Sequence, residues 1–317
     1  MRMRLRLLLI ILMLIFAAVI ALLAGWILWQ ELQNPVAVLD RSSEGLQLLH
    51  RFRYPVDLGT EARVFQDVIL WAPDLDTIRI TLSFPEGVQD VLPVIFVLGG
   101  LEVGRQSLFY IPDHGQNVIV AYEYPYSPHY WYQGTPLSEI PAIRRAALRV
   151  PAQILAVWQW IRQQSWADTT RMTLTGYSFG AMFVPAIYHL GRQKGIRFGP
   201  TVIVYGGTRI DRLLAHNMIF LPSLVRPVIA FLAARAIYPL EPSRHLSALT
   251  GEFLLINGWY DQLVPEWSWM PLQQGIPGQK TILNLPEAHM HPGNPELTRR
   301  LVRLSRQWLL ERDRIRP

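Results

Sequence analysis

Apolar residues run without a charge from Leu7 to Trp29, close to the amino terminus. A helix of about 20 apolar residues crosses the roughly 30 Å hydrocarbon layer of a bilayer. Arg2, Arg4 and Arg6 precede this run, and the segment after it carries no comparable excess of positive charge. Because positively charged flanks stay in the cytoplasm, residues 1–33 are predicted to be a single-pass transmembrane anchor. The amino terminus is then cytoplasmic, and the rest of the chain is periplasmic or extracellular.

A cleaved signal peptide would share the charged start and the apolar stretch, and Val19 and Ala21 would suit a cleavage site. Cleavage there would leave the apolar residues 25–29 at the new amino terminus. The pattern therefore favours an uncleaved anchor, with secretion after signal cleavage as the alternative.

Beyond residue 59 the chain contains a series of short apolar runs. Glu61–Trp71 and Thr77–Phe84 alternate apolar and polar residues, as half-buried strands do. Leu92–Leu98 is continuously apolar, which is typical of a strand buried on both faces. Five more β-branched or aliphatic runs follow, at Asn117–Tyr122, Arg171–Thr175, Thr201–Tyr205, Glu252–Ile256 and Lys280–Leu285. Residues 34–59 are interpreted as a connector, and residues 60–317 as one folded domain.

Helix-like stretches separate these runs, at residues 140–164, 179–194 and 295–312. Strands that alternate with helices predict an α/β fold, with a mainly parallel eight-stranded sheet and helices on both faces. Ligand chemistry is then expected at the carboxyl ends of the strands. Residues 208–249 break the alternation as a long, hydrophobic, helix-rich run. They are interpreted as a helical cap or lid insertion, with one more packing layer as the alternative.

Composition narrows the possible functions. The chain has no cysteine, which excludes disulfides, thiolate metal ligands and a cysteine nucleophile. The net charge is +6, but half of it comes from the three arginines ahead of the apolar run. A nucleic-acid partner is therefore not expected.

The pentapeptide Gly176–Gly180 reads Gly-Tyr-Ser-Phe-Gly and matches the pattern G-x-S-x-G. It directly follows the strand-like run 171–175 and opens an apolar helix, which is the strand–turn–helix context of a nucleophile elbow. Glycine at both ends removes side chains that would collide with neighbouring elements. The turn also aims the backbone NH of Phe179 at the negative charge that an attack by Ser178 would generate.

A serine nucleophile needs a base to accept its proton and a carboxylate to orient that base. Asp261 lies in the loop after the strand-like run 252–256, and His289 lies in the loop after the run 280–285. The order serine, acid, histidine is the one expected for this context. His291, two residues further on, is the alternative base.

A second oxyanion donor is expected from the loop after the run 92–98, where Gly99 and Gly100 allow close approach of the backbone. The NH of Gly100 or of Leu101 would then point at the substrate. An ordinary tight turn is the alternative interpretation of this sequence.

From about residue 60 to residue 313 the sequence resembles the α/β-hydrolase superfamily. The resemblance rests on the elbow, on G-x-x-D-x-x-V-P at 258–265 and on H-x-x-P at 289–292. It implies Ser178 as nucleophile, Asp261 as acid and His289 as base, with no metal or cofactor. The sequence departs from many esterases because no histidine precedes Gly99, and Pro185 is expected to kink the helix after the nucleophile.

The expected function is a serine hydrolase that cleaves a carboxylic ester or thioester through an acyl-serine intermediate. Aromatic residues crowd Tyr122–Tyr132, and together with the hydrophobic run 208–249 they favour a hydrophobic acyl ester as substrate. The alternatives are an acyltransferase or amidase with the same three residues, and a non-catalytic envelope protein that keeps the fold as a scaffold.

Overall fold

The structure is a computed structural model that describes residues 2–59, 61–87, 90–100, 104–126 and 136–317. The helices are α1 (Arg2–Leu32), α2 (Pro35–Leu39), α3 (Arg105–Leu108), α4 (Pro136–Arg162), α5 (Val184–Gln193), α6 (Ile210–Asn217), α7 (Arg226–Ala236), α8 (Glu266–Gly275) and α9 (Pro295–Leu310). The strands are β1 (Gln47–Asp57), β2 (Ala62–Ala72), β3 (Asp76–Pro85), β4 (Leu92–Leu98), β5 (Val118–Glu123), β6 (Ala167–Tyr177), β7 (Thr201–Val204), β8 (Glu252–Gly258) and β9 (Gln279–Leu285).

All these strands form one sheet in the order β1-β2-β3-β5-β4-β6-β7-β8-β9. The first three strands and β5 pair antiparallel to one another, while the strands from β5 to β9 pair in parallel. This confirms the predicted α/β fold with its mainly parallel sheet. The carboxyl ends of β4, β6, β7, β8 and β9 consequently meet along one edge of the sheet.

Among the residues that the structure describes, the sheet has nine strands and not the eight that were predicted. The additional strand is β1, which lies within the segment interpreted as a connector and pairs with β2 over almost its whole length. Most of its residues are exposed, so its apolar side chains do not mark a buried face. The adjoining helix α2 buries Val36 and Leu39 against the domain core. Residues 34–59 are therefore largely part of the fold.

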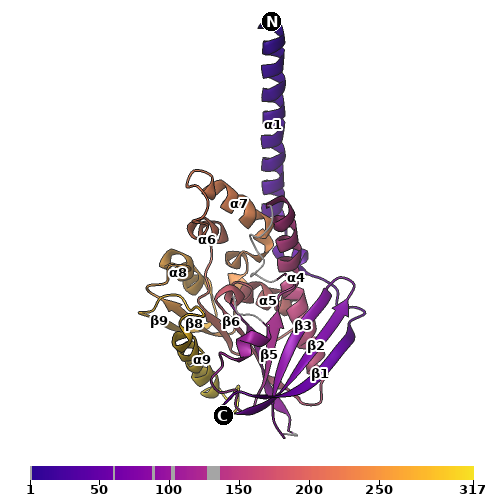
Figure 1. Cartoon of the computed structure of the whole chain (residues 1–317), viewed down its shortest axis with the longest axis vertical. Coiled ribbons are helices and arrows are strands. Elements are labelled where there is room, and N and C mark those ends of the chain that lie inside the picture. Colours follow the sequence, from indigo (N-terminus) through magenta and orange to yellow (C-terminus); the bar gives the residue numbers. More distant parts are fainter. Residues whose placement is uncertain (1, 60, 88–89, 101–103, 127–135) are drawn as a thin grey trace.

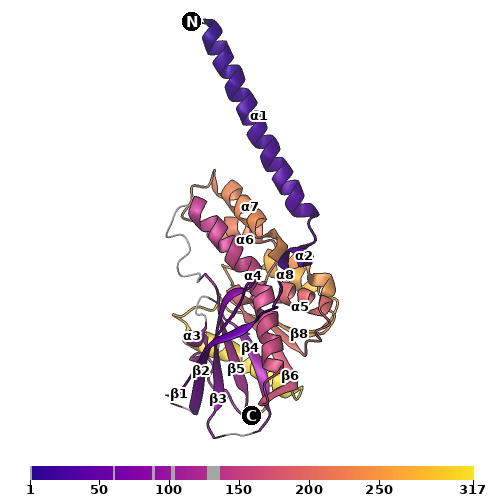
Figure 2. The same cartoon turned by 90° about the vertical axis from the view of Figure 1, so that its right-hand side faces the viewer.

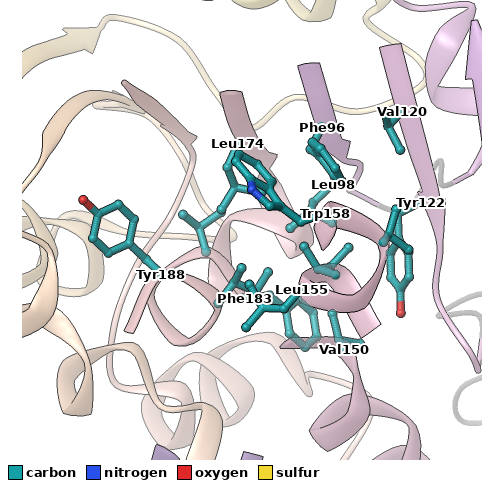
Figure 3. Packing of buried hydrophobic residues seen from close by; sticks show 14 of the residues in the cluster. Phe96, Leu98, Val120, Tyr122, Val150, Leu155, Trp158, Leu174, Phe183 and Tyr188 are labelled. Atoms are coloured by element: carbon teal, nitrogen blue, oxygen red, sulfur yellow. The ribbon is translucent and has the colours of Figure 1, made fainter. Parts of the chain in front are cut away.

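Helices cover both faces of the sheet. Successive side chains of β4 point to opposite faces and are apolar, so each face needs helices to bury it. Phe96 and Leu98 pack against α4 and α5, and the Phe96 ring stacks on Trp158 with 4.7 Å between ring centroids. Figure 3 shows this layer, in which Leu155, Trp158 and Phe183 meet the strand residues Phe96 and Leu174. Val97 on the other side joins the core beneath α9.

Residues 208–249 form α6, α7 and three short 3-10 turns between β7 and β8. In Figures 1 and 2, α6 and α7 lie at the end of the body from which α1 projects, and the carboxyl terminus lies at the opposite end. Residues 6–32 of α1 form a helix that is long and apolar enough to cross a membrane, and their apolar side chains are mostly exposed. The predicted transmembrane helix thus stands outside the packed body of the protein.

Candidate active site

Ser178 lies at the tip of a sharp turn between β6 and a 3-10 turn over Ser178–Met182. Its backbone φ is +52°, a left-handed conformation that is strained for a residue with a side chain. A Cβ atom on Gly176 would lie 2.5 Å from Cγ2 of Val184, and one on Gly180 would lie 2.1 Å from the carbonyl oxygen of Leu98. Both glycines are therefore required by the packing around this turn.

The helix that follows the elbow differs from the sequence prediction at Pro185. Helix α5 begins at Val184, so Pro185 falls in its first turn, where a missing NH costs no helical hydrogen bond. The 3-10 turn over Ser178–Met182 precedes it. The proline therefore starts the helix and does not kink it.

Ser178, His289 and Asp261 form a chain of short hydrogen bonds. Ser178 Oγ lies 2.6 Å from His289 Nε2, and His289 Nδ1 lies 2.7 Å from Asp261 Oδ2. Because a carboxylate can only accept, Nδ1–H donates to Asp261, which leaves Nε2 free to accept the Ser178 hydroxyl proton. Both His289 and Asp261 are buried. The arrangement can move a proton from the serine to the histidine.

The acid is fixed by its own loop. Asp261 Oδ1 accepts hydrogen bonds from the backbone NH groups of Leu263 and Val264, both at 2.8 Å. The loop also binds the histidine loop, since the NH groups of Trp259 and Tyr260 donate to the carbonyls of Leu285 and Glu287, at 2.8 and 3.1 Å. The relative position of acid and base is therefore set by backbone contacts.

Tyr205 supports the histidine loop and was not recognised from the sequence. It follows β7 with a φ of +56°, its ring centroid lies 4.9 Å from that of His289, and its hydroxyl donates to the carbonyl of Ala288 at 2.9 Å. Burial raises the pKa of Tyr205 well above its usual value, so the hydroxyl stays protonated and keeps donating. A tyrosine at a strand end carries no recognisable motif, which explains why it was missed.

His291 is placed differently from His289. Its side chain is exposed, and its Nδ1 accepts a hydrogen bond from the NH of Gly293 at 3.1 Å. It lines the same cavity as Ser178. Its geometry is that of a residue at the rim of the cavity, because the Nε2 that approaches Ser178 belongs to His289.

Two of the three predicted oxyanion donors, Gly100 and Phe179, are among the described residues, and both lie next to Ser178. A Cβ atom on Gly100 would lie 3.2 Å from Cβ of Ser178 and 3.6 Å from its Oγ, so the Gly100 backbone directly faces the nucleophile. Phe179 follows Ser178 in the 3-10 turn. Leu101 lies outside the described residues, as do residues 127–132 of the predicted aromatic segment.

Tyr124 holds the peptide between Gly99 and Gly100. Its hydroxyl donates to the carbonyl of Gly99 at 3.0 Å, and its ring packs edge-on against Phe179, with 5.1 Å between centroids. Burial raises the pKa of Tyr124 far above its usual value, so it remains a donor. In a trans peptide the carbonyl and the next NH point in opposite directions. The bond to Tyr124 therefore also fixes the direction of the Gly100 NH.

The Gly100 NH is a predicted oxyanion donor, and loss of such a donor weakens mainly the binding of the transition state. We therefore expect Tyr124→Phe to lower kcat about tenfold, with KM changed less. Tyr122→Phe is the matched control, because the Tyr122 hydroxyl donates to the side chain of Gln153 and not to the Gly99 loop. Steady-state kinetics on both variants, with thermal denaturation to check folding, test this role. An unchanged kcat in Tyr124→Phe would show that Tyr124 contributes only through the packing of its ring.

A cavity of about 470 Å³ opens at Ser178 and is lined mainly by apolar side chains. The part lined by residues of the 208–249 segment, which include Ile210, Leu213 and Leu214, is here called the outer arm. The other part, here called the inner arm, lies between the sheet and α9 and is lined by residues that include Ile95, Ile119, Val302, Leu309 and Ile315.

Comparison with known proteins agrees with this fold. The prolyl oligopeptidase family model matches residues 144–276, less than half of the chain, a range that contains Ser178 and Asp261 but ends before His289. Among proteins with curated functions, none is significantly similar to this chain in sequence.

Solved structures of similar fold include several esterases and a peptidase. Acetyl xylan esterase 1 from Thermoanaerobacterium sp. superposes with a TM-score of 0.60 at 13% identity, covering 84% of this chain and 91% of that chain. Acetyl xylan esterase from Paenibacillus sp. R4 gives 0.59 at 15% identity, covering 88% and 94%. Acylaminoacyl peptidase from Pyrococcus horikoshii gives 0.55 at 16% identity, covering 83% and 42%. With its sheet order and nucleophile elbow, the chain is an α/β-hydrolase-fold protein.

Proposed function

We propose that the protein is a serine hydrolase that cleaves a carboxylic ester or thioester with a hydrophobic acyl group. The observation that carries the proposal is the hydrogen-bonded series Ser178–His289–Asp261, whose serine and histidine line an apolar cavity. The partial match to a peptidase family and the fold of known esterases support the same class of chemistry.

In this mechanism Ser178 Oγ attacks the acyl carbonyl carbon while His289 Nε2 takes the hydroxyl proton. Asp261 stabilises the imidazolium that forms, and the NH groups of Phe179 and Gly100 bind the oxyanion of the tetrahedral intermediate. The alcohol or thiol leaves with the proton from His289. Water then attacks the acyl-serine, giving its proton to His289, and collapse of the second intermediate releases the acid and restores the Ser178 hydroxyl.

The inner arm supports an extended acyl group as the substrate. Ile95 lies in the middle of β4, a central strand, and yet is only half-buried. The helix α3, next to this part of the sheet, has only four residues. The sheet face between α3 and α9 is thus left partly open, and its apolar lining suits a hydrocarbon chain attached to the carbonyl at Ser178.

We expect Val302→Phe to reduce kcat/KM for p-nitrophenyl palmitate by about tenfold or more, because a larger side chain in the inner arm excludes part of the acyl chain. The butyrate ester, which is shorter, should be affected much less. Leu310→Phe, on the same helix but not among the residues lining the cavity, is the control. Equal losses on the two esters would show that the inner arm does not hold the acyl chain.

The location proposed for the enzyme follows from α1. Residues 6–32 can cross a membrane, and Arg2, Arg4 and Arg6 favour a cytoplasmic amino terminus, so the hydrolase domain lies on the exported side. Secretion after cleavage of α1 is the alternative. We further propose that residues 208–249 act as a lid over the outer arm, to which α6 contributes side chains.

A second candidate is cleavage of an amide, which the partial match to the prolyl oligopeptidase family favours.

Pre-steady-state kinetics on the purified full-length protein test the main proposal. A p-nitrophenyl ester should give a burst of nitrophenolate equivalent to the enzyme concentration, and Ser178→Ala should give none. If only p-nitroanilides were turned over, the amidase would replace the esterase, and if neither substrate reacted with folded protein, the scaffold alternative would hold.

A further inference from the structure

Residues 219–228, the connection from α6 into α7, form an exposed apolar segment that we call the α6–α7 tip. Leu224 is 88% exposed, Ile219 77% and Val228 60%. Soluble proteins rarely gather apolar side chains on one exposed patch unless the patch binds something. The tip is therefore expected to be a binding surface.

The charged side chains of residues 212–240, the stretch of chain that contains the tip, are all arginines. Within the tip only Arg226 is charged, and its guanidinium donates to the carbonyls of Leu221 and Ile219, at 3.0 and 3.4 Å from Nη2. Residues 212–240 contain no aspartate or glutamate but three arginines. An apolar segment flanked in sequence by arginines and by no acidic residue matches the chemistry of a bilayer surface that contains anionic lipids.

Arginines of the 208–249 segment, which carries the tip, bind the carboxyl-terminal end of α1. Arg235, in the last turn of α7, pairs with Glu31 at 3.0 Å. Arg244 donates to the carbonyls of Glu31 and Gln33 at 3.1 and 2.7 Å. The apolar run of α1 ends at Trp29, just before these contacts. The polar edge of a bilayer crossed by α1 is therefore fixed next to α7.

The views in Figures 1 and 2 agree that α7 and α1 lie at the same end of the molecule, while β1 lies away from it. The catalytic cavity is tied to this end through α6. Leu213 of α6 lines the cavity, and Asn217 at the end of the helix donates to the carbonyl of Leu263 in the acid loop at 2.9 Å. The tip begins two residues after Asn217.

We propose that the α6–α7 tip inserts into the same bilayer that α1 crosses, so that the outer arm receives its substrate from the membrane. The substrate is then a lipid ester, whose acyl chain passes from the bilayer to Ser178 without crossing water. The identity of the substrate rests on the proposed hydrolase function, whereas insertion of the tip does not.

Because the chain has no cysteine, a single label can be placed on the full-length protein. Leu224→Cys carries an environment-sensitive fluorophore in vesicles of phosphatidylcholine and phosphatidylglycerol. Leu49→Cys on β1, 56% exposed in the native chain, is the matched control. We expect nitroxide-bearing lipids to quench the label at 224 and aqueous iodide, present on both sides, to quench the label at 49. Equal quenching of both labels by iodide would show that the tip stays in water and would overturn the proposal. A protein partner would then be the alternative occupant of the tip.

Activity provides the second readout. Leu224→Asp combined with Val228→Asp should lower hydrolysis of a vesicle-embedded lipid ester about tenfold relative to hydrolysis of a water-soluble butyrate ester. Leu49→Asp should leave this ratio unchanged. A ratio unaffected by the double substitution would contradict delivery from the membrane. If the wild-type protein hydrolysed neither ester while lipids still quenched the label at 224, the proposed hydrolase function would be rejected. Insertion of the tip into the bilayer would be retained.

Discussion

Replacing His289 with alanine is expected to lower kcat for ester hydrolysis on the order of 10⁶-fold, as loss of the base does in a serine protease with the same three residue types. The reason is that Nε2 of His289 is the atom 2.6 Å from Ser178 Oγ, and Asp261 holds it there through Nδ1. Replacing His291, which is exposed and bonded to Gly293, should change kcat less than about tenfold. Steady-state kinetics on the two purified variants measure the contrast.

The control for this prediction is the double variant Ser178→Ala with His289→Ala. Residues that act as one unit are not additive, so the double variant should lose about as much activity as either single variant. If His291→Ala lost as much activity as His289→Ala while staying folded, the assignment of the base would be wrong.

Gly180→Ala is expected to abolish activity and to lower the free energy of unfolding by about 2–4 kcal/mol. The new Cβ would lie 2.1 Å from the carbonyl oxygen of Leu98 and 2.7 Å from that of Gly99, so the elbow and the end of β4 would have to move apart. That movement separates Ser178 from Gly100. Urea denaturation and the burst amplitude with a p-nitrophenyl ester report the two effects.

Gly199→Ala is the matched substitution outside the site. Its Cβ would meet one atom, the carbonyl oxygen of Met172, at 3.2 Å. We expect a loss of stability below about 1 kcal/mol and an unchanged burst. A folded and fully active Gly180→Ala would show that the elbow tolerates a side chain, which the geometry of the turn does not allow.

The fold was predictable from sequence where burial and periodicity coincide. Leu92–Leu98 is buried except at Ile95 and reads as a continuous apolar run, and the order of strands and helices indicates the α/β class. Strand β1 was missed because an edge strand is held by backbone pairing to β2, which leaves little trace in the side chains. A search for hydrophobic patterns cannot find such an element.

The candidate site divides in the same way. Ser178, Asp261 and His289 stood in short motifs after predicted strands, and the structure places their side chains within hydrogen-bond distance of one another. Tyr124 and Tyr205 act through contacts with backbone carbonyls far away in sequence, which no local pattern encodes. The inner arm was equally hidden, since a cavity arises from side chains that fail to fill a space.

Covalent labelling of the full-length protein by a fluorophosphonate, followed by peptide mass spectrometry, shows whether Ser178 is an activated nucleophile. We expect one modified peptide, with the phosphonate on Ser178, strong labelling in His291→Ala and essentially none in His289→Ala or Ser178→Ala. Folded wild-type protein that remains unlabelled, or that carries the label on another residue, would contradict this role of Ser178.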